Sequence, residues 1–129
     1  MSQENVETIR RAYEAFSRGD FDTARRVAHP EVVFVPPGGQ SPLRGAAFRA
    51  WMEPDAIAEQ RSEPREFRVN GDKILVRQHT WSRGAGSGIE MEADFWAVWT
   101  FDEDGLVTRI EVFLVDQEGE ALEAAGLSE

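Results

Sequence analysis

Two polar side chains, Arg77 and His79, interrupt a segment that otherwise has the composition of a β-strand. Residues two apart on a strand point to the same face of a sheet. Histidine exchanges a proton near neutral pH, and arginine holds a carboxylate or a developing oxyanion. If this face is the inner one, the pair indicates a metal-free acid–base site in which His79 moves the proton and Arg77 binds the anion.

Aromatic side chains could complete such a site. Tyr13 is the sole tyrosine and falls on the apolar stripe of the first expected helix, where it could supply a hydroxyl. The simpler interpretation is a core aromatic whose hydroxyl finds a partner. Trp51, Trp81 and Trp99 would give flat walls to a ring-bearing ligand, and core packing explains them equally well.

The direction of Arg77 and His79 depends on alternation in three successive strand-like segments, 73–83, 90–101 and 107–114. In the last segment the apolar set that predicts the core is Ile110, Val112 and Leu114. The matching set of the middle segment is entirely apolar: Met91, Ala93, Phe95, Ala97, Trp99 and Phe101. Placing Trp81 opposite Met91 across the glycine loop 84–88 makes the inner set of the first segment Leu75, Arg77, His79 and Trp81. A slip of one residue would reverse this assignment.

An inward charge needs a partner, water or a ligand. Three interpretations stay open: an ion pair with an acid of the covering helix such as Glu53 or Asp55, contact with a ligand, or a wrong register. The ligand interpretation predicts a largely apolar pocket lined by Val35, Trp51, Leu75, Trp81, Phe95, Ala97 and Trp99, with Tyr13, Arg77 and His79 as its reactive groups.

The opposite face of these segments carries an apolar band among acids: Ile74, Val76, Trp96, Val98 and Phe113. An apolar patch on a sheet face often marks an interface between subunits. We therefore predict a homodimer through Trp96, Val98 and Phe113.

The remaining elements precede or follow these strands. Periodic apolar residues predict a helix over 2–18, a second helix capped by Asp20 and a third over 45–60 interrupted at Pro54. A short strand is expected at 32–35, the main sheet from residue 66, a hairpin at Asn70-Gly71 and a last helix over 120–125. Helices followed by an antiparallel meander predict an α+β fold in a single domain over residues 1–129.

Composition excludes several classes of function. The chain of 129 residues has no cysteine, which rules out disulfides, thiol catalysis and thiolate metal sites. Its net charge of −10 disfavours nucleic acids and anionic membrane surfaces. His29 and His79 lack metal-ligand spacing, so we expect no metal and no cofactor. No apolar run is long enough to span a membrane and the N-terminus lacks a secretory pattern, so a cytoplasmic location is expected.

Short motifs run along the whole chain: YEAFSRGD at 13–20, HPEV at 29–32, LRG at 43–45, WTFDEDG at 99–105 and EALEAAGL at 120–127. In order and spacing they resemble the SnoaL-like branch of the nuclear transport factor two-like, ketosteroid-isomerase-like superfamily. The resemblance implies a cone, a strongly curved sheet wrapped around helices, that is commonly dimeric.

The same resemblance implies a range of activities, because isomerases, polyketide cyclases, dehydratases, epoxide hydrolases and non-catalytic binding domains share this fold. The three chemical positions of the isomerase fall at about Ala12, Val35 and Ala97, all apolar, so ketosteroid isomerase chemistry is not expected. Two hypotheses remain. One is cofactor-free isomerase, cyclase or dehydratase-type chemistry on a small organic molecule, an aromatic or acid-bearing one among the candidates. The other is a non-catalytic binding or dimeric interaction domain.

Overall fold

The computed structural model describes residues 2–52 and 57–127. In chain order its elements are α1 (Ser2–Ser17), α2 (Phe21–Arg26), β1 (Ala28–Val35), β2 (Leu43–Arg44), α3 (Ala46–Trp51), β3 (Ile57–Asn70), β4 (Lys73–Gly84), β5 (Glu90–Phe101), β6 (Val107–Leu114), the 3₁₀ helix η1 (Val115–Gln117) and α4 (Glu118–Ala124). The strands form one mixed sheet in the order β2-β1-β6-β5-β4-β3. The predicted α+β fold, with N-terminal helices against a curved and mostly antiparallel sheet, is confirmed.

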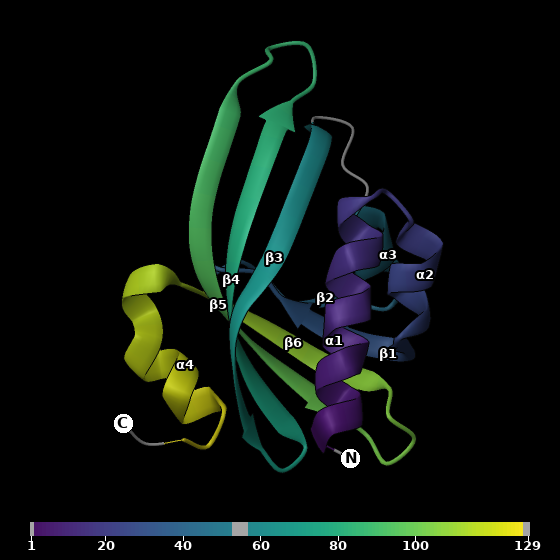
Figure 1. The fold of residues 1–129 in the computed structure, drawn as a ribbon, viewed down its shortest axis with the longest axis vertical. Coiled ribbons are helices and arrows are strands. Elements are labelled where there is room, and N and C mark those ends of the chain that lie inside the picture. The colour runs from purple at the N-terminus through teal and green to yellow at the C-terminus, as the bar shows by residue number, and fades with distance from the viewer. Residues whose placement is uncertain (1, 53–56, 128–129) are drawn as a thin grey trace.

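The helices divide between the two faces of the sheet (Figure 1). α1, α2 and α3 gather on one side, which we call the concave face, and α4 lies alone on the other side, the convex face. α1 turns its apolar stripe, with Ile9, Ala12 and Tyr13 buried, toward the sheet. Asp20 caps α2 as expected, since its side chain accepts a hydrogen bond from the Thr23 N–H at 3.2 Å.

The segment after α3 differs from the prediction. The helix expected over 45–60 ends at Trp51, and β3 begins at Ile57 and continues through Pro64 to Asn70. β3 is an edge strand, where a proline is tolerated because its missing N–H faces no neighbour. The strand accommodates Pro64 with a register shift before Glu66. The predicted interruption at Pro54 lies outside the described residues.

The pairing of β4 with β5 corrects the predicted register by one residue. Ser82, not Trp81, lies opposite Met91, and Trp81 lies opposite Glu92. The Gly84 N–H donates to the Ile89 carbonyl at 2.9 Å, which leaves the even-membered loop 85–88 between them. The predicted pairing required an odd-membered loop. The side chains of Arg77, His79 and Trp81 therefore point to the convex face, and those of Gln78 and Thr80 point to the concave face.

Two apolar cores flank the sheet. The larger one lies between the concave face and the helices and includes Ile9, Val32, Ile74, Val76 and Trp99. The smaller one lies under α4, where Leu75, Trp96 and Val98 pack on Ala121, Leu122 and Ala125, with Phe113 half-buried beside them.

The predicted outward band is thus divided between the two cores. Ile74 and Val76 face inward, and α4 leaves Trp96 only 4% and Val98 0% exposed. The prediction that these residues form one outward band open to a second subunit was wrong, because the register differs by one residue and the last helix covers part of the sheet. Two of the three residues named for a dimer interface are therefore inaccessible in this chain.

Candidate ligand-binding pocket

A cavity of about 220 Å³ opens between the concave face and the three N-terminal helices. One end is aromatic. Phe34 of β1 stacks on Phe48 of α3 with ring centroids 4.6 Å apart, and the Trp51 ring lies 4.6 Å from Phe34 and 6.4 Å from Phe48. Trp51 is 46% exposed, so its ring is available to a ligand. Its position at the end of α3 follows from Gly45, whose N–H bonds the Val32 carbonyl at 2.9 Å and ties α3 to β1.

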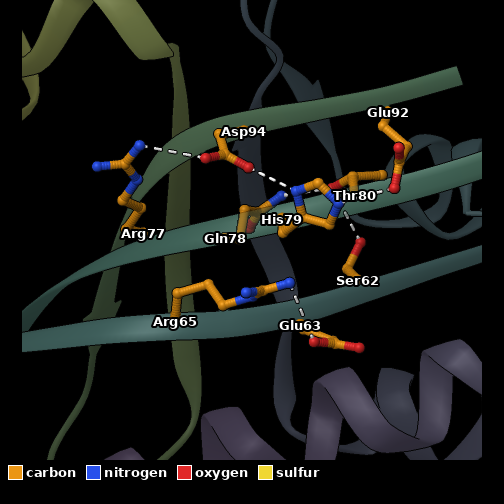
Figure 2. A network of polar contacts seen from close by, with 9 residues as sticks. All are labelled: Ser62, Glu63, Arg65, Arg77, Gln78, His79, Thr80, Glu92 and Asp94. Atoms are coloured by element: carbon orange, nitrogen blue, oxygen red, sulfur yellow. Dashed lines mark hydrogen bonds and ion pairs between the residues drawn. The ribbon is translucent and has the colours of Figure 1, made fainter.

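The other end of the pocket is polar but uncharged. Gln78 and Thr80 of β4 and Ser62 of β3 project onto the concave face, where the Ser62 and Thr80 hydroxyl oxygens lie 3.1 Å apart (Figure 2). Gln78 Nε2 lies 3.5 Å from Thr80 Oγ1. We call Ser62, Gln78 and Thr80 the polar wall. The polar wall arises from alternation along two neighbouring strands: Gln60 and Ser62 of β3 face inward, as do Gln78 and Thr80 of β4.

Tyr13 of α1 completes the polar wall from the helix side. Its hydroxyl donates a hydrogen bond to Gln78 Oε1, and its ring lies 5.6 Å from that of Trp99. Burial raises the pKa of the Tyr13 phenol, and the neighbouring Trp99 indole N–H opposes only part of this rise. Tyr13 is therefore a neutral donor at physiological pH. The position on the apolar stripe and the hydroxyl were both predicted, whereas Gln78 as the partner was not.

Among the described residues that line the pocket, none carries a group suited to proton transfer near neutral pH. Among its described residues none is Asp, Glu, Lys, Arg or His, and Tyr13 is the only titratable side chain. General acid–base catalysis requires a group whose pKa lies near the working pH. The described lining can therefore bind and orient a molecule, but it holds no general base.

Arg77 and His79 lie outside this pocket, in a charged cluster on the convex face (Figure 2). The His79 Nδ1 atom lies 2.6 Å from Asp94 Oδ1, and its Nε2 atom lies 3.1 Å from Glu92 Oε1. Arg77 Nη2 donates to Asp94 Oδ2 at 3.1 Å. The expectation that both side chains face inward was wrong because of the one-residue register shift. Their partner is Asp94 of β5; Glu53 and Asp55 lie outside the described residues.

The cluster shifts the pKa values of its members in opposite directions. Hydrogen bonds with Asp94 and then with Glu92 raise the pKa of His79. Hydrogen bonds with His79 and then with Arg77 lower the pKa of Asp94. Because both ring nitrogens face carboxylates, the cluster favours the doubly protonated imidazolium, in which both nitrogens donate.

The other predicted site residues also divide between the two faces. Tyr13, Trp51, Phe95 and Trp99 line the pocket. Leu75 is buried under α4 and Trp81 lies on the convex face, where the Arg61 guanidinium sits 4.2 Å from its ring centroid. Ala97 packs in the larger core, and Val35 of β1 is half-buried, but neither is among the residues that line the pocket.

Sequence reasoning missed the polar wall. The signal was present, since Ser62, Gln78 and Thr80 are polar residues at alternate positions of two strands. The predicted register left Gln78 and Thr80 out of the inner set, and Ser62 precedes residue 66, where the sheet was expected to begin.

The chain belongs to the SnoaL-like domain family, because a sequence model of that family matches residues 9–110. No curated protein sequence matches the chain. Among solved structures, a nuclear transport factor two-like protein of unknown function from Burkholderia pseudomallei is 24% identical, with 94% of this chain and 96% of that chain covered and a TM-score of 0.73.

Two further structures have described ligands or activities. TerC, co-crystallised with polyporic acid, is 25% identical with a TM-score of 0.71, over 92% of this chain and 98% of its own. SalBIII, an epoxide hydrolase/cyclase-like enzyme in pyran ring formation in salinomycin, is 18% identical with a TM-score of 0.78, over 86% of this chain and 90% of its own. Family and fold are thus shown, and the fold accommodates both catalysis and binding.

Two other kinds of site are absent from the described residues. No group of three or more His, Asp or Glu side chains in 2–52 and 57–127 is arranged to hold a metal ion. No helix in the same ranges is long and apolar enough to cross a membrane.

Proposed function

We propose that this chain binds a small ring-bearing organic molecule in the concave pocket and does not transform it by acid–base chemistry. The observation that carries the proposal is the lining itself: aromatic at one end, hydrogen-bonding at the other, and without a carboxylate or imidazole among its described residues. The cavity of about 220 Å³ suits a ligand of one or two rings.

The relatives support the binding part of this proposal. TerC was crystallised with polyporic acid. The apolar residues at Val35 and Ala97, where the resemblance places catalytic carboxylates, support the non-catalytic part. Binding without proton transfer is the function that requires nothing beyond the described pocket.

The test is a titration with a two-ring ketone, 2-acetylnaphthalene, followed by the indole N–H signals of the four tryptophans in ¹H–¹⁵N NMR spectra. We expect Trp51 and Trp99, which line the pocket, to shift, and Trp81 and Trp96 of the convex face to stay in place. No saturable shift of Trp51 or Trp99 would overturn the binding proposal.

Catalysis is tested separately with the same compound in D₂O. A general base beside the ketone would accelerate exchange of its methyl hydrogens for deuterium. We expect the exchange rate with protein to equal the rate without it. An acceleration by the protein would overturn the non-catalytic part of the proposal.

We keep homodimerisation as a second proposal, on a revised surface. The part of the convex face beyond α4 carries Arg77, His79 and Trp81 together with acidic side chains, so it offers both charges and an aromatic ring to a second copy. Light scattering tests it: twice the mass of 14.5 kDa supports the dimer, and a single mass refutes it.

A further inference from the structure

We propose that the pocket selects neutral molecules bearing a hydrogen-bond acceptor, such as a ketone, quinone or ester, and that Gln78 determines this preference, positioned by Tyr13. The inference rests on the proposed binding function and specifies its ligand class.

The first argument is the orientation of the Gln78 amide. The Tyr13 hydroxyl donates to Gln78 Oε1, so the acceptor end of the amide is already occupied. What the side chain offers to the cavity is its NH₂ group, with two donor hydrogens. One of them faces Thr80 Oγ1 at 3.5 Å, the limit of a hydrogen bond, and a carbonyl oxygen would replace that contact with a better one. Tyr13 therefore acts through Gln78, as a positioning residue.

The second argument is an excess of donors around this end of the pocket. The Trp99 Nε1–H is buried and has no hydrogen-bond partner within the described ranges. The Trp99 ring lies beside that of Tyr13, with centroids 5.6 Å apart. Ser62 and Thr80 share one hydroxyl hydrogen between their two oxygens, which leaves the other hydroxyl hydrogen for a ligand. A ligand that carries a hydrogen-bond acceptor would therefore pair with these donors.

The third argument concerns charge. No described lining residue is cationic, and Arg77, which adjoins Gln78 in the chain, pairs with Asp94 on the opposite face. A buried carboxylate without a cation loses its hydration and gains no compensating ion pair. The net charge of −10 adds a further unfavourable potential for anions. The pocket should therefore discriminate against acids, which reverses the acid-bearing ligand expected from an inward Arg77.

The experiment compares three ligands of one shape by calorimetric titration: 2-acetylnaphthalene, 2-isopropenylnaphthalene and 2-naphthoate. The second replaces the carbonyl oxygen by CH₂, and the third replaces the methyl group by a charged oxygen. Since a net hydrogen bond contributes modestly, we expect the ketone to bind about tenfold more tightly than the alkene. The naphthoate should bind at least about a hundredfold more weakly than the ketone.

Variants connect the preference to its residues. Gln78→Met removes the amide and should bring the ketone-to-alkene ratio to about one; Gln78→Glu, nearly isosteric, should invert it by replacing donors with acceptors. Tyr13→Phe should reduce the ratio without removing alkene binding. His79→Gln, one residue away on the opposite face, is the matched control and should keep the wild-type ratio.

The outcomes distinguish failure of the proposed ligand preference from failure of the proposed binding function. If none of the three ligands binds, the proposed function fails. If the alkene binds as tightly as the ketone, or the naphthoate binds as tightly as either, the function stands and the inference is overturned. A wild-type ratio preserved in both Gln78 variants would also overturn the role of Gln78.

Discussion

Gln78 and His79 are neighbours in the chain and belong to opposite sides of the protein. The Gln78 amide oxygen accepts a hydrogen bond from the Tyr13 hydroxyl inside the pocket, while His79 Nδ1 lies 2.6 Å from Asp94 Oδ1 on the convex face. The alternation of β4 separates a neutral binding wall from a charged surface cluster by a single residue. Each face can therefore be altered without the other, which makes the following predictions separable.

The charged cluster predicts a pH-dependent contribution of His79 to stability. Because the folded-state pKa of His79 is raised, its contribution is fully present below the unfolded pKa of about 6.5 and is lost as pH rises through the folded value. We expect the melting temperature of His79→Gln to fall below wild type at pH 5–6 and to approach it above that folded value.

Asp94→Asn provides the companion experiment. The lowered pKa of Asp94 stabilises the fold above its unfolded pKa of about 3.9, and this contribution is lost as pH falls through the lower folded value. In Asp94→Asn the His79 pKa, measured by NMR titration, should fall toward its ordinary value. An unchanged His79 pKa would contradict the pairing.

Trp51 predicts a loss of binding with little loss of stability. Its ring is 46% exposed at the aromatic end of the pocket, so Trp51→Ala should weaken binding of 2-acetylnaphthalene about five- to tenfold. The free energy of unfolding should change by only about 1 kcal/mol. Trp81→Ala on the convex face is the control, and an equal loss of affinity there would argue against the pocket.

Because α4 covers the convex face, shortening the Leu122 side chain should destabilise the protein. This side chain is buried against the sheet, so Leu122→Ala should lower the free energy of unfolding by about 2–3 kcal/mol in urea denaturation. Glu123→Ala, on the exposed side of the same helix, should change it by less than about 0.5 kcal/mol. Equal effects would mean that α4 does not pack on the convex face in solution.

A substitution of Gly45 should strain the backbone and thereby disturb the pocket. It has φ +49°, and a Cβ atom there would lie 2.9 Å from the Pro30 carbonyl oxygen. Gly45→Ala should cost about 2–3 kcal/mol and weaken ligand binding, because the glycine precedes the helix that carries Phe48 and Trp51. Gly39→Ala has a positive φ but open space, and about 1 kcal/mol is expected for it. Similar losses at both positions would contradict the steric argument.

The sequence allowed the fold to be predicted because its signals are local and strong. The stripe of Ile9 and Tyr13, the Asp20 cap and the Asn70-Gly71 hairpin each specify an element without reference to distant residues. The segment 57–60 was assigned wrongly to a helix because its strand character comes from pairing with β4, a long-range contact that periodicity does not report.

The site was harder to predict because the face on which its β4 residues lie depends on whether the loop between β4 and β5 has an odd or an even number of residues. Both faces of β4 carry polar side chains, Arg77 and His79 on one and Gln78 and Thr80 on the other, so alternation alone does not identify the inner face. Loop 85–88 decides the parity, and a run of glycines and small residues accepts either pairing. Arg77 and His79 were interpreted as site residues because a buried charge is rare and often functional. Burial of a charge is costly, however, and the two side chains lie on the convex face.

The position of α4 in the chain has a consequence for synthesis. α4 follows all the strands in the chain, so the apolar strip formed by Leu75, Trp96 and Val98 cannot be covered until residues 118–124 have been made. A sheet that forms before α4 docks would expose this apolar strip, and exposed apolar surface favours aggregation. The Asn70 amide, which donates to the Ala125 and Gly126 carbonyls at 2.9 and 3.1 Å, then fastens the helix once it arrives. Docking of α4 thus closes the convex face of the sheet.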